Sequence, residues 1–379
     1  MTDGTTGQEQ WRAVRSWMKA SRHELAVAAA DLYQDTPKVE GTRLLCRPEW
    51  LPAEPVELGA AQLRWHNQAA APATTGSGDQ AAAVRPPTDG GEPFATYAEA
   101  IAALDRPALF ENRPLYRLLA ADLTGQHRLD LTAGQYFDSV SVGEALAHEF
   151  AATTRARQSP VLDRLPLRAA IGDPCDLPRR PASLAVTTLT LRRSGPGQAS
   201  FLLHWRDPAK VTNAGGLYQV MPVGIFQPAD DNPDSIGRDL NLWHSIAREL
   251  SEELLGASED YASFGSPVRY HQWPFYQRLT EARHTGTLRV WILGLGVDPL
   301  TMTTDMLTVA VIDADLFDEV FANLVAVNSE GRIINDTATT GFAFTESSVH
   351  RFSTREPMQA AGAAILRLAW KHQRSLLLG

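Results

Sequence analysis

The chain has 379 residues and a formal net charge of −9 at pH 7, with 44% of its residues hydrophobic and 21% charged. This composition is typical of a globular protein large enough for a main domain and a second, smaller unit. No apolar stretch approaches the roughly 20 residues that a membrane span needs, and an acidic chain lacks the basic surface that captures nucleic acid. We therefore expect neither membrane insertion nor a nucleic-acid partner.

Two cysteines, Cys46 and Cys175, lie far apart in the sequence, and neither belongs to a CxxC motif or a Cys/His cluster. This pattern predicts neither a disulfide framework nor a zinc site. The N-terminal residues MTDGTTGQEQ lack the basic and apolar regions of a secretory signal. We therefore expect a cytoplasmic protein.

The N-terminal segment, residues 1–66, begins with a stretch that is free of Pro and Gly from residue 8 to residue 33. Apolar residues recur there at roughly helical spacing: Trp11, Val14, Trp17, Met18 and Leu25. The spacing predicts one long amphipathic helix. It packs against the rest of the chain or against a second copy in a homodimer; a DNA-recognition helix is the less favoured alternative.

Residues 67–93 are rich in Ala, Pro, Gly, Thr and Ser, which predicts a flexible linker. Residues 94–181 follow as a small α+β unit with two helices and a strand pair, LYRLLAADL and HRLDLTAG. Its sequence contains no obvious chemical motif.

Residues 182–350 are predicted to form the main domain. SLAVTTLTLRR and ASFLLHWRD flank a GPG turn and predict a hairpin, and GGLYQVMPVGIFQP predicts a third strand. Two further strands, LRVWILGLGV and MLTVAVI, precede a helix at ADLFDEVFANLVAVN and a short strand at GFAFT. Residues 351–379 are predicted as a C-terminal helix that opens with Ser353 and Glu356 at capping-box spacing.

The most informative segment is a helix predicted from about Asp239 to Leu255. One side carries an apolar stripe of Trp243, Ile246, Ala247, Leu250 and Leu254. The other side carries Glu249, Glu252 and Glu253 at spacings of three and four residues. Like charges at these spacings repel, so the patch is either a solvated acidic face or a site for a divalent cation.

The string RELSEELLG, from Arg248 to Gly256, resembles the end of the Nudix box, GX5EX7REUXEEXGU, where U is aliphatic. Gly224 corresponds to the first glycine of that box. The preceding strands follow the order of the Nudix hydrolase superfamily, and the region from LPAEP onward is similar to a divergent, actinobacterial type. The box itself departs from the pattern in three ways: Asp230 replaces its first Glu, about ten residues are inserted before Arg248, and Leu255 is extra.

The resemblance implies an α/β (α+β) fold in which a Nudix-like mixed sheet lies between helices, beside the smaller N-terminal unit. It also implies that Glu249, Glu252, Glu253 and the backbone of Gly224 bind Mg²⁺ or Mn²⁺, and that Arg248 orients a carboxylate. The implied reaction is attack of a metal-polarised water on a diphosphate. Glu249, Glu253 and Arg248 are therefore the expected catalytic residues.

The general base varies within the superfamily, and the candidates here are Glu253, Asp298 and Asp305, of which only the first belongs to the motif. Arg206 is a candidate for binding phosphate, and Trp205 or Tyr218 for stacking on a base, although each is as readily explained by packing. An aromatic cluster of Tyr270, Trp273, Phe275 and Tyr276 is more typical of a core or lid than of a base-binding platform.

Three functions agree with these patterns. The first is a Nudix-type pyrophosphohydrolase that cleaves a phosphoanhydride in a nucleoside diphosphate linked to another group. The second is a non-catalytic sensor or regulator that binds a nucleotide-type ligand on the same fold, and the third is a scaffold that assembles through its N-terminal helix. The three retained glutamates favour catalysis, whereas the altered spacing of the box favours sensing.

Overall fold

The largest sheet of the computed structural model is built around strands β5 and β11. The structure describes residues 6–206, 216–256, 260–325, 331–334 and 341–378. In spatial order the sheet contains β1 (Val56–Glu57), β10 (Leu288–Val297), β11 (Thr304–Asp313), β5 (Leu184–Gly195), β6 (Gln198–Phe201) and β13 (Phe342–Ala343), and β9 (Val223–Ile225) also pairs with β5. β11 and β5 are parallel and the other pairs are antiparallel, so the sheet is mixed.

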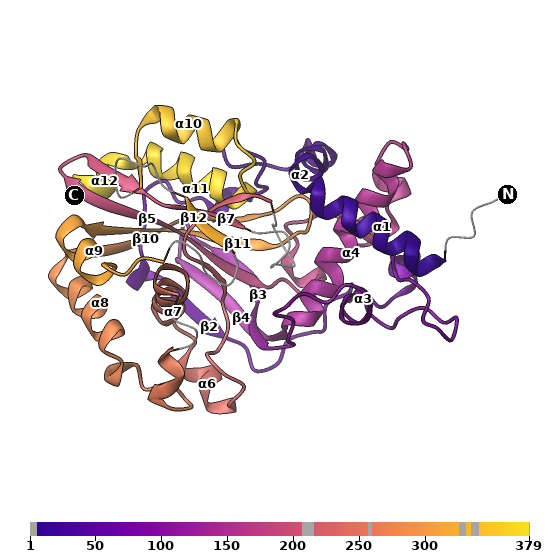
Figure 1. The fold of residues 1–379 in the computed structure, drawn as a ribbon, viewed down its shortest axis with the longest axis horizontal. Helices are drawn as coiled ribbons and strands as arrows, with labels where there is room; N and C mark the ends of the chain where they lie inside the picture. Colours follow the sequence, from indigo (N-terminus) through magenta and orange to yellow (C-terminus); the bar gives the residue numbers. More distant parts are fainter. Residues whose placement is uncertain (1–5, 207–215, 257–259, 326–330, 335–340, 379) are drawn as a thin grey trace.

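Helices cover both faces of this sheet. Figure 1 shows α10 (Glu346–Thr354) and α11 (Ala360–Lys371) on one side, and α7 (Leu242–Leu255) and α8 (Pro274–Thr285) on the other. Most residues of β5 and nearly all of β11 are buried, as expected for strands covered on both faces. The predicted mixed α/β class, with a sheet between helices, is therefore confirmed.

The predicted hairpin is present, but its second strand and the third strand are each divided. β5 pairs with β6, after which β7 (Leu203–Arg206) joins a second sheet with β8 (Tyr218–Val220) and β12 (Gly331–Ile334). The third predicted strand changes sheets at the cis peptide between Met221 and Pro222. β9 thereby returns to β5, and Gly224 lies in register with Val186.

The predicted α+β unit is continuous with the main sheet. It contains a third sheet of β2 (Gln62–Trp65), β4 (Arg128–Gln135) and β3 (Pro114–Asp122), with α3 (Tyr97–Leu104), α4 (Tyr136–Arg155) and α5 (Pro166–Ile171). The backbone N–H of Tyr116 donates to the carbonyl of Phe226 at 3.1 Å, and that of Leu118 donates to the carbonyl of Ala182 at 2.9 Å. These bonds fix β3 beside the ends of β9 and β5.

The N-terminal segment forms two helices rather than one, because the chain bends at Ser21 between α1 (Gly7–Ala20) and α2 (Arg22–Ala30). Both helices pack on α4 (Figure 1). β1, from the same segment, extends the main sheet by pairing with β10. Residues 6–66 are thus part of the fold.

Part of residues 67–93, the segment predicted as a flexible linker, is packed in the structure. It contains a short 3-10 helix, Asp79–Val84, in which Ala81 and Val84 are buried in the core. The indole N–H of Trp11 donates to the carbonyl of Val84 at 3.1 Å. Small side chains permit this close packing.

The C-terminal region also differs from the prediction. Ser353 lies inside α10 and is buried, so it does not cap a helix; α11 and α12 (Gln373–Leu377) follow as separate helices. The predicted helix after β11 is α9 (Ala314–Val320), and the last residues of that prediction lie outside the described part. In the parts of the chain that the structure describes, no helix is both long enough and apolar enough to cross a membrane.

Candidate functional site

The predicted acidic helix is α7, and local sequence determines both of its ends. The side chain of Asn241 accepts hydrogen bonds from the backbone N–H groups of Trp243 and His244, and Gly256 ends the helix with a φ of 65°. All members of the apolar stripe are buried: Trp243, Ile246, Ala247, Leu250 and Leu254. The predicted inward face is therefore confirmed.

The glutamates of α7 meet strand β9. The carboxylate of Glu249 lies against the α-carbon of Gly224, so closely that a Cβ at this position would overlap it. Glu253 is only 5% exposed, and its Oε1 accepts the backbone N–H of Val223 at 2.9 Å. Glu252 is half-buried. The structure thus brings Gly224 and Glu249 together and directs Glu253 to the backbone of β9.

A cavity of about 370 Å³ opens beside this contact. Gly224, Glu249 and Glu252 belong to its lining, as does Asp305 of β11. Gln219 of β8 and Gln359, which precedes α11, also line it. The volume is in the range of pockets that hold small organic ligands.

Asp305 is a buried carboxyl in the lining of this cavity, and the residue is only 1% exposed. Its Oδ1 accepts the hydroxyl of Thr187 at 2.8 Å. Burial raises the pKa of Asp305 to about 7, and the negative charge of Asp298 adds to this effect while Thr187 opposes it. A carboxyl with this pKa exchanges a proton near neutral pH.

The other two candidate bases have structural contacts. Asp298 accepts the backbone N–H groups of Leu300 and Thr301 and the hydroxyl of Thr301, which orders the turn between β10 and β11. Glu253 anchors β9, as described above. Among the three candidates, Asp305 is the one that lines the cavity.

Arg248 connects α7 to the segments on either side of it. It donates to the hydroxyl of Tyr270 and, at 2.6 Å, to the carbonyl of Gln227, and it lies 3.7 Å from the carboxylate of Asp239. The hydroxyl of Tyr270 donates to the same carboxylate at 2.7 Å, and its ring stacks on His244 with centroids 3.8 Å apart. The inserted residues before Arg248 are thus held by a buried polar cluster, which the box pattern did not predict.

The three candidate substrate-binding residues do not all lie at the cavity. Arg206 lines the cavity. Trp205 and Tyr218 are paired across β7 and β8, where Arg332 lies 5.0 Å above the Trp205 ring and Phe352 meets Tyr218 edge-on. These contacts are typical of packing, and neither residue contributes to the described lining of the cavity.

The N-terminal unit supplies the remaining wall, which the sequence did not indicate. Leu109, Phe110 and Arg113, from the loop before β3, line the cavity, as does Tyr136 at the start of α4. The backbone N–H of Tyr136 donates to the carbonyl of Arg113 at 2.9 Å, which fixes these two residues relative to each other. They are distant in sequence from the box, so no local pattern could assign them.

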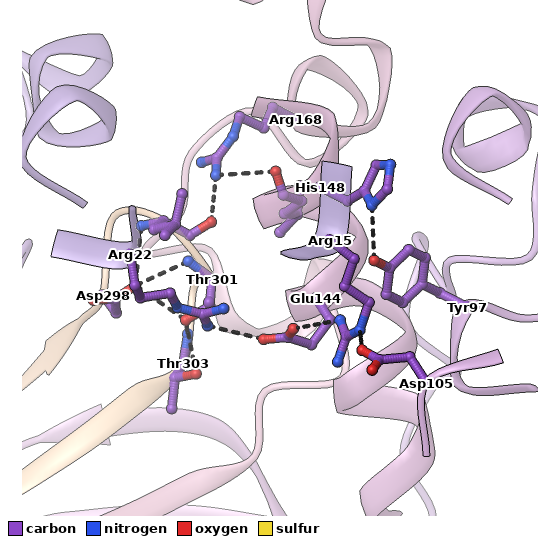
Figure 2. A network of polar contacts seen from close by, with 12 residues as sticks. Arg15, Arg22, Tyr97, Asp105, Glu144, His148, Arg168, Asp298, Thr301 and Thr303 are labelled. Atoms are coloured by element: carbon purple, nitrogen blue, oxygen red, sulfur yellow. Dashed lines mark hydrogen bonds and ion pairs between the residues drawn. The ribbon is translucent and has the colours of Figure 1, made fainter. Parts of the chain in front are cut away.

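A buried ionic network supports that wall. Figure 2 shows Glu144 of α4 between Arg15 of α1, at 3.0 Å, and Arg22 of α2, at 2.8 Å. Burial alone would raise the pKa of Glu144, but the two guanidinium groups outweigh it and the pKa is lowered. Glu144 lines the cavity together with Thr301 and Thr303, so the N-terminal helices are connected directly to the site.

The donor set fits a cation that binds together with a ligand. Within the described residues, no group of three or more His, Cys, Asp and Glu side chains is arranged to hold a metal. Glu249 and Glu252 nevertheless share the cavity with the Gly224 backbone. Mg²⁺ is commonly bound by one or two carboxylates, with water and substrate phosphates completing its shell.

Comparisons with known proteins add no assignment. No protein-family model matches the chain, and a search of curated proteins finds no match either.

Proposed function

We propose that this protein is a metal-dependent hydrolase that cleaves a phosphoanhydride bond in a nucleoside diphosphate linked to another group. The observation that carries the proposal is the contact between the Glu249 carboxylate and Gly224 at a cavity shared with Glu252 and Asp305. In the Nudix-like pattern, Gly224 corresponds to the first glycine of the box and Glu249 to the first of the three glutamates of the metal site. The lining of this cavity also contains two arginines, Arg113 and Arg206.

Each group has a chemical part in this proposal. Glu249 and Glu252 would hold Mg²⁺ or Mn²⁺, which when bound polarises water and neutralises charge on phosphate oxygens. Arg113 and Arg206, which line the same cavity, would bind phosphate. The attacking water forms a new P–O bond as the bridging P–O bond breaks, and its proton passes to Oδ2 of Asp305.

The test is a screen of diphosphate compounds with Mg²⁺ or Mn²⁺ that measures released phosphate, mononucleotide and pyrophosphate together. Glu249→Gln and Glu252→Gln should each reduce hydrolysis by about two orders of magnitude or more, because each removes a charged ligand without changing shape. Glu281→Gln, on the exposed face of α8, is the matched control and should be fully active.

The competing function is a sensor that binds such a ligand without turnover. It would be favoured if the wild-type protein bound a nucleoside diphosphate tightly yet released no product with either metal. Equal behaviour of Glu252→Gln and wild type in both binding and turnover would contradict a role for the acidic helix in either function.

A further inference from the structure

A second cavity lies in the N-terminal unit, apart from the first cavity, which Gly224 and Glu249 line. It has a volume of about 240 Å³ and is lined by residues of β3, β4, the first turn of α4 and the segment 69–72. Among the described residues, the linings of the two cavities have no member in common. The volume is below the range of pockets for drug-sized ligands, so the second cavity suits a small metabolite.

Arg117 of β3 is a buried charged side chain in this lining, and it is only 6% exposed. Its two terminal nitrogens donate to the carbonyls of Ala70 and Pro178, each at 3.0 Å. Its Nε is buried and has no hydrogen-bond partner within the described parts of the chain. A guanidinium group carries five N–H donors, so the two carbonyls satisfy Arg117 only in part.

The charge of Arg117 is also uncompensated. Both of its hydrogen-bond partners are neutral carbonyls, and it forms no ion pair with a carboxylate in the part of the chain that the structure describes. Burial lowers the pKa of its guanidinium group, and the negative charge of Asp138 opposes this effect only in part. A buried charge is costly unless it is paired. The missing partner of Arg117 is therefore an anionic group that enters the cavity.

Asp138 lines the same cavity from the first turn of α4, and it is exposed. Because a negative charge repels another, Asp138 disfavours a multiply charged anion such as phosphate. A ligand with one carboxylate for Arg117 and one ammonium group for Asp138 would compensate both charges.

Most of the remaining lining is apolar, and its side chains are mainly small: Ala69, Ala70, Ala71, Pro72, Leu115 and Pro181. Such a surface suits an aliphatic group, because contact with it removes apolar area of both the ligand and the protein from water.

We propose that the second cavity binds a small zwitterion, an α-amino acid with an aliphatic side chain, whose carboxylate contacts Arg117 and whose ammonium group contacts Asp138. This inference does not depend on the proposed hydrolase activity. Asp138 is adjacent in sequence to Ser139, which lines the first cavity, so the first turn of α4 contributes to both cavities.

The experiment measures the binding of L-alanine, L-valine, L-leucine and L-isoleucine by calorimetry, without metal or nucleotide. The amino acid that binds most tightly is then compared with its amide, which lacks the carboxylate, and with its deamino acid, which lacks the ammonium group. The wild-type protein should bind the amino acid about tenfold or more tightly than either analogue, because each analogue leaves one charged side chain without a partner.

Asp138→Asn should bind the amino acid and the deamino acid equally, while its preference for the amino acid over the amide remains. Its melting temperature should match that of wild type, because asparagine keeps an acceptor oxygen for the backbone N–H of Gln135. Asp315→Asn, at an exposed aspartate in the first turn of α9, is the matched control and should keep both preferences.

The proposal would be overturned if none of the four amino acids bound, or if Asp138→Asn bound all three compounds as the wild type does. Inorganic phosphate or the deamino acid, bound by wild type as tightly as the amino acid, would indicate a simple anion site and would also overturn it. Because the assay contains no diphosphate, none of these outcomes bears on the proposed hydrolase activity.

Discussion

At the scale of single residues, the cavity depends on two positions whose environments are unusual. Gly224 has to be glycine, because the carboxylate of Glu249 occupies the space that a Cβ would take. Asp305 is a carboxyl buried beside a second acidic residue, Asp298, and it therefore retains its proton to a higher pH than an exposed aspartate. The first position sets the geometry of the proposed metal site, and the second makes the site sensitive to pH.

The raised pKa of Asp305 predicts how stability changes with pH. In the folded protein the pKa of the Asp305 carboxyl is about 7, whereas in the unfolded chain it has the ordinary value of 3.8. The stabilisation is therefore complete below about pH 4 and is lost as the pH rises through 7. Asp305→Asn removes this titration, so at pH 8 its free energy of unfolding should exceed that of wild type by about 2–4 kcal/mol.

Urea unfolding at intervals between pH 4 and pH 8 measures this effect. The difference between variant and wild type should grow across the interval, while Asp234→Asn, at an exposed position on α6 (Pro233–Arg238), should follow the wild type. If the free energies of unfolding of Asp305→Asn and wild type differ by the same amount at every pH, the Asp305 carboxyl does not titrate in this range.

At the scale of elements, the position of α4 relative to α1 and α2 is set by charge as well as by apolar packing. Glu144 bonds to Arg15 and Arg22 while all three side chains are buried, and Asp105 adds a second carboxylate to Arg15 at 2.5 Å. Replacing one member of a buried ionic cluster leaves the others charged and uncompensated. The network therefore specifies which surfaces of α1, α2 and α4 pack against each other.

Glu144→Gln should destabilise the protein by roughly 3–5 kcal/mol, because two buried guanidinium groups lose their shared carboxylate. Denaturant unfolding measures the change. Glu319→Gln, which breaks the exposed ion pair with Arg278, is the control and should leave stability nearly unchanged. A Glu144→Gln variant as stable as the control would mean that apolar contacts alone dock the N-terminal helices.

At the scale of the whole molecule, the cavity joins parts of the chain that the sequence divides into separate units. Its walls come from the main domain, from the loop before β3, and from α4. Backbone hydrogen bonds between β3 and the ends of β5 and β9 hold these parts in one arrangement. A ligand bound in the cavity contacts all of them and should stabilise the complete fold.

This arrangement predicts that metal and ligand stabilise the protein jointly. Two carboxylates bind Mg²⁺ weakly by themselves, so millimolar Mg²⁺ alone should change the melting temperature little. Mg²⁺ with a nucleoside diphosphate such as ADP at about 100 times its dissociation constant should add about 2.7 kcal/mol of stability by mass action. Differential scanning fluorimetry measures the change in melting temperature. In Glu252→Gln, the part of this change that depends on Mg²⁺ should be lost. If Mg²⁺ alone raised the melting temperature as much as Mg²⁺ with the ligand, the proposed shared binding would be contradicted.

The sequence by itself was sufficient for the features set by local chemistry. The apolar stripe and acidic face of α7 follow from helical spacing, and its end follows from Gly256; the helix begins at Leu242, after the Asn241 cap, rather than at about Asp239 as predicted. The strands β5, β10 and β11 follow from their runs of β-branched and apolar residues. These features depend on neighbours within a few residues, which a pattern can capture.

Local patterns were insufficient where packing between distant segments decides the outcome. Composition suggested a linker at residues 67–93, but Ala81 and Val84 are buried there in the core. The helical spacing of Glu249, Glu252 and Glu253 put all three on one predicted face and gave no reason to separate them, yet Glu253 bonds to the backbone of β9 while Glu252 lines the cavity. The burial of Asp305 beside Asp298, and the convergence of Gln219 and Gln359 on one cavity, depend on strand order and helix docking. The sequence determined which side chains could do chemistry; only the tertiary structure decided which of them meet, because burial and distance between remote segments are properties of the folded chain.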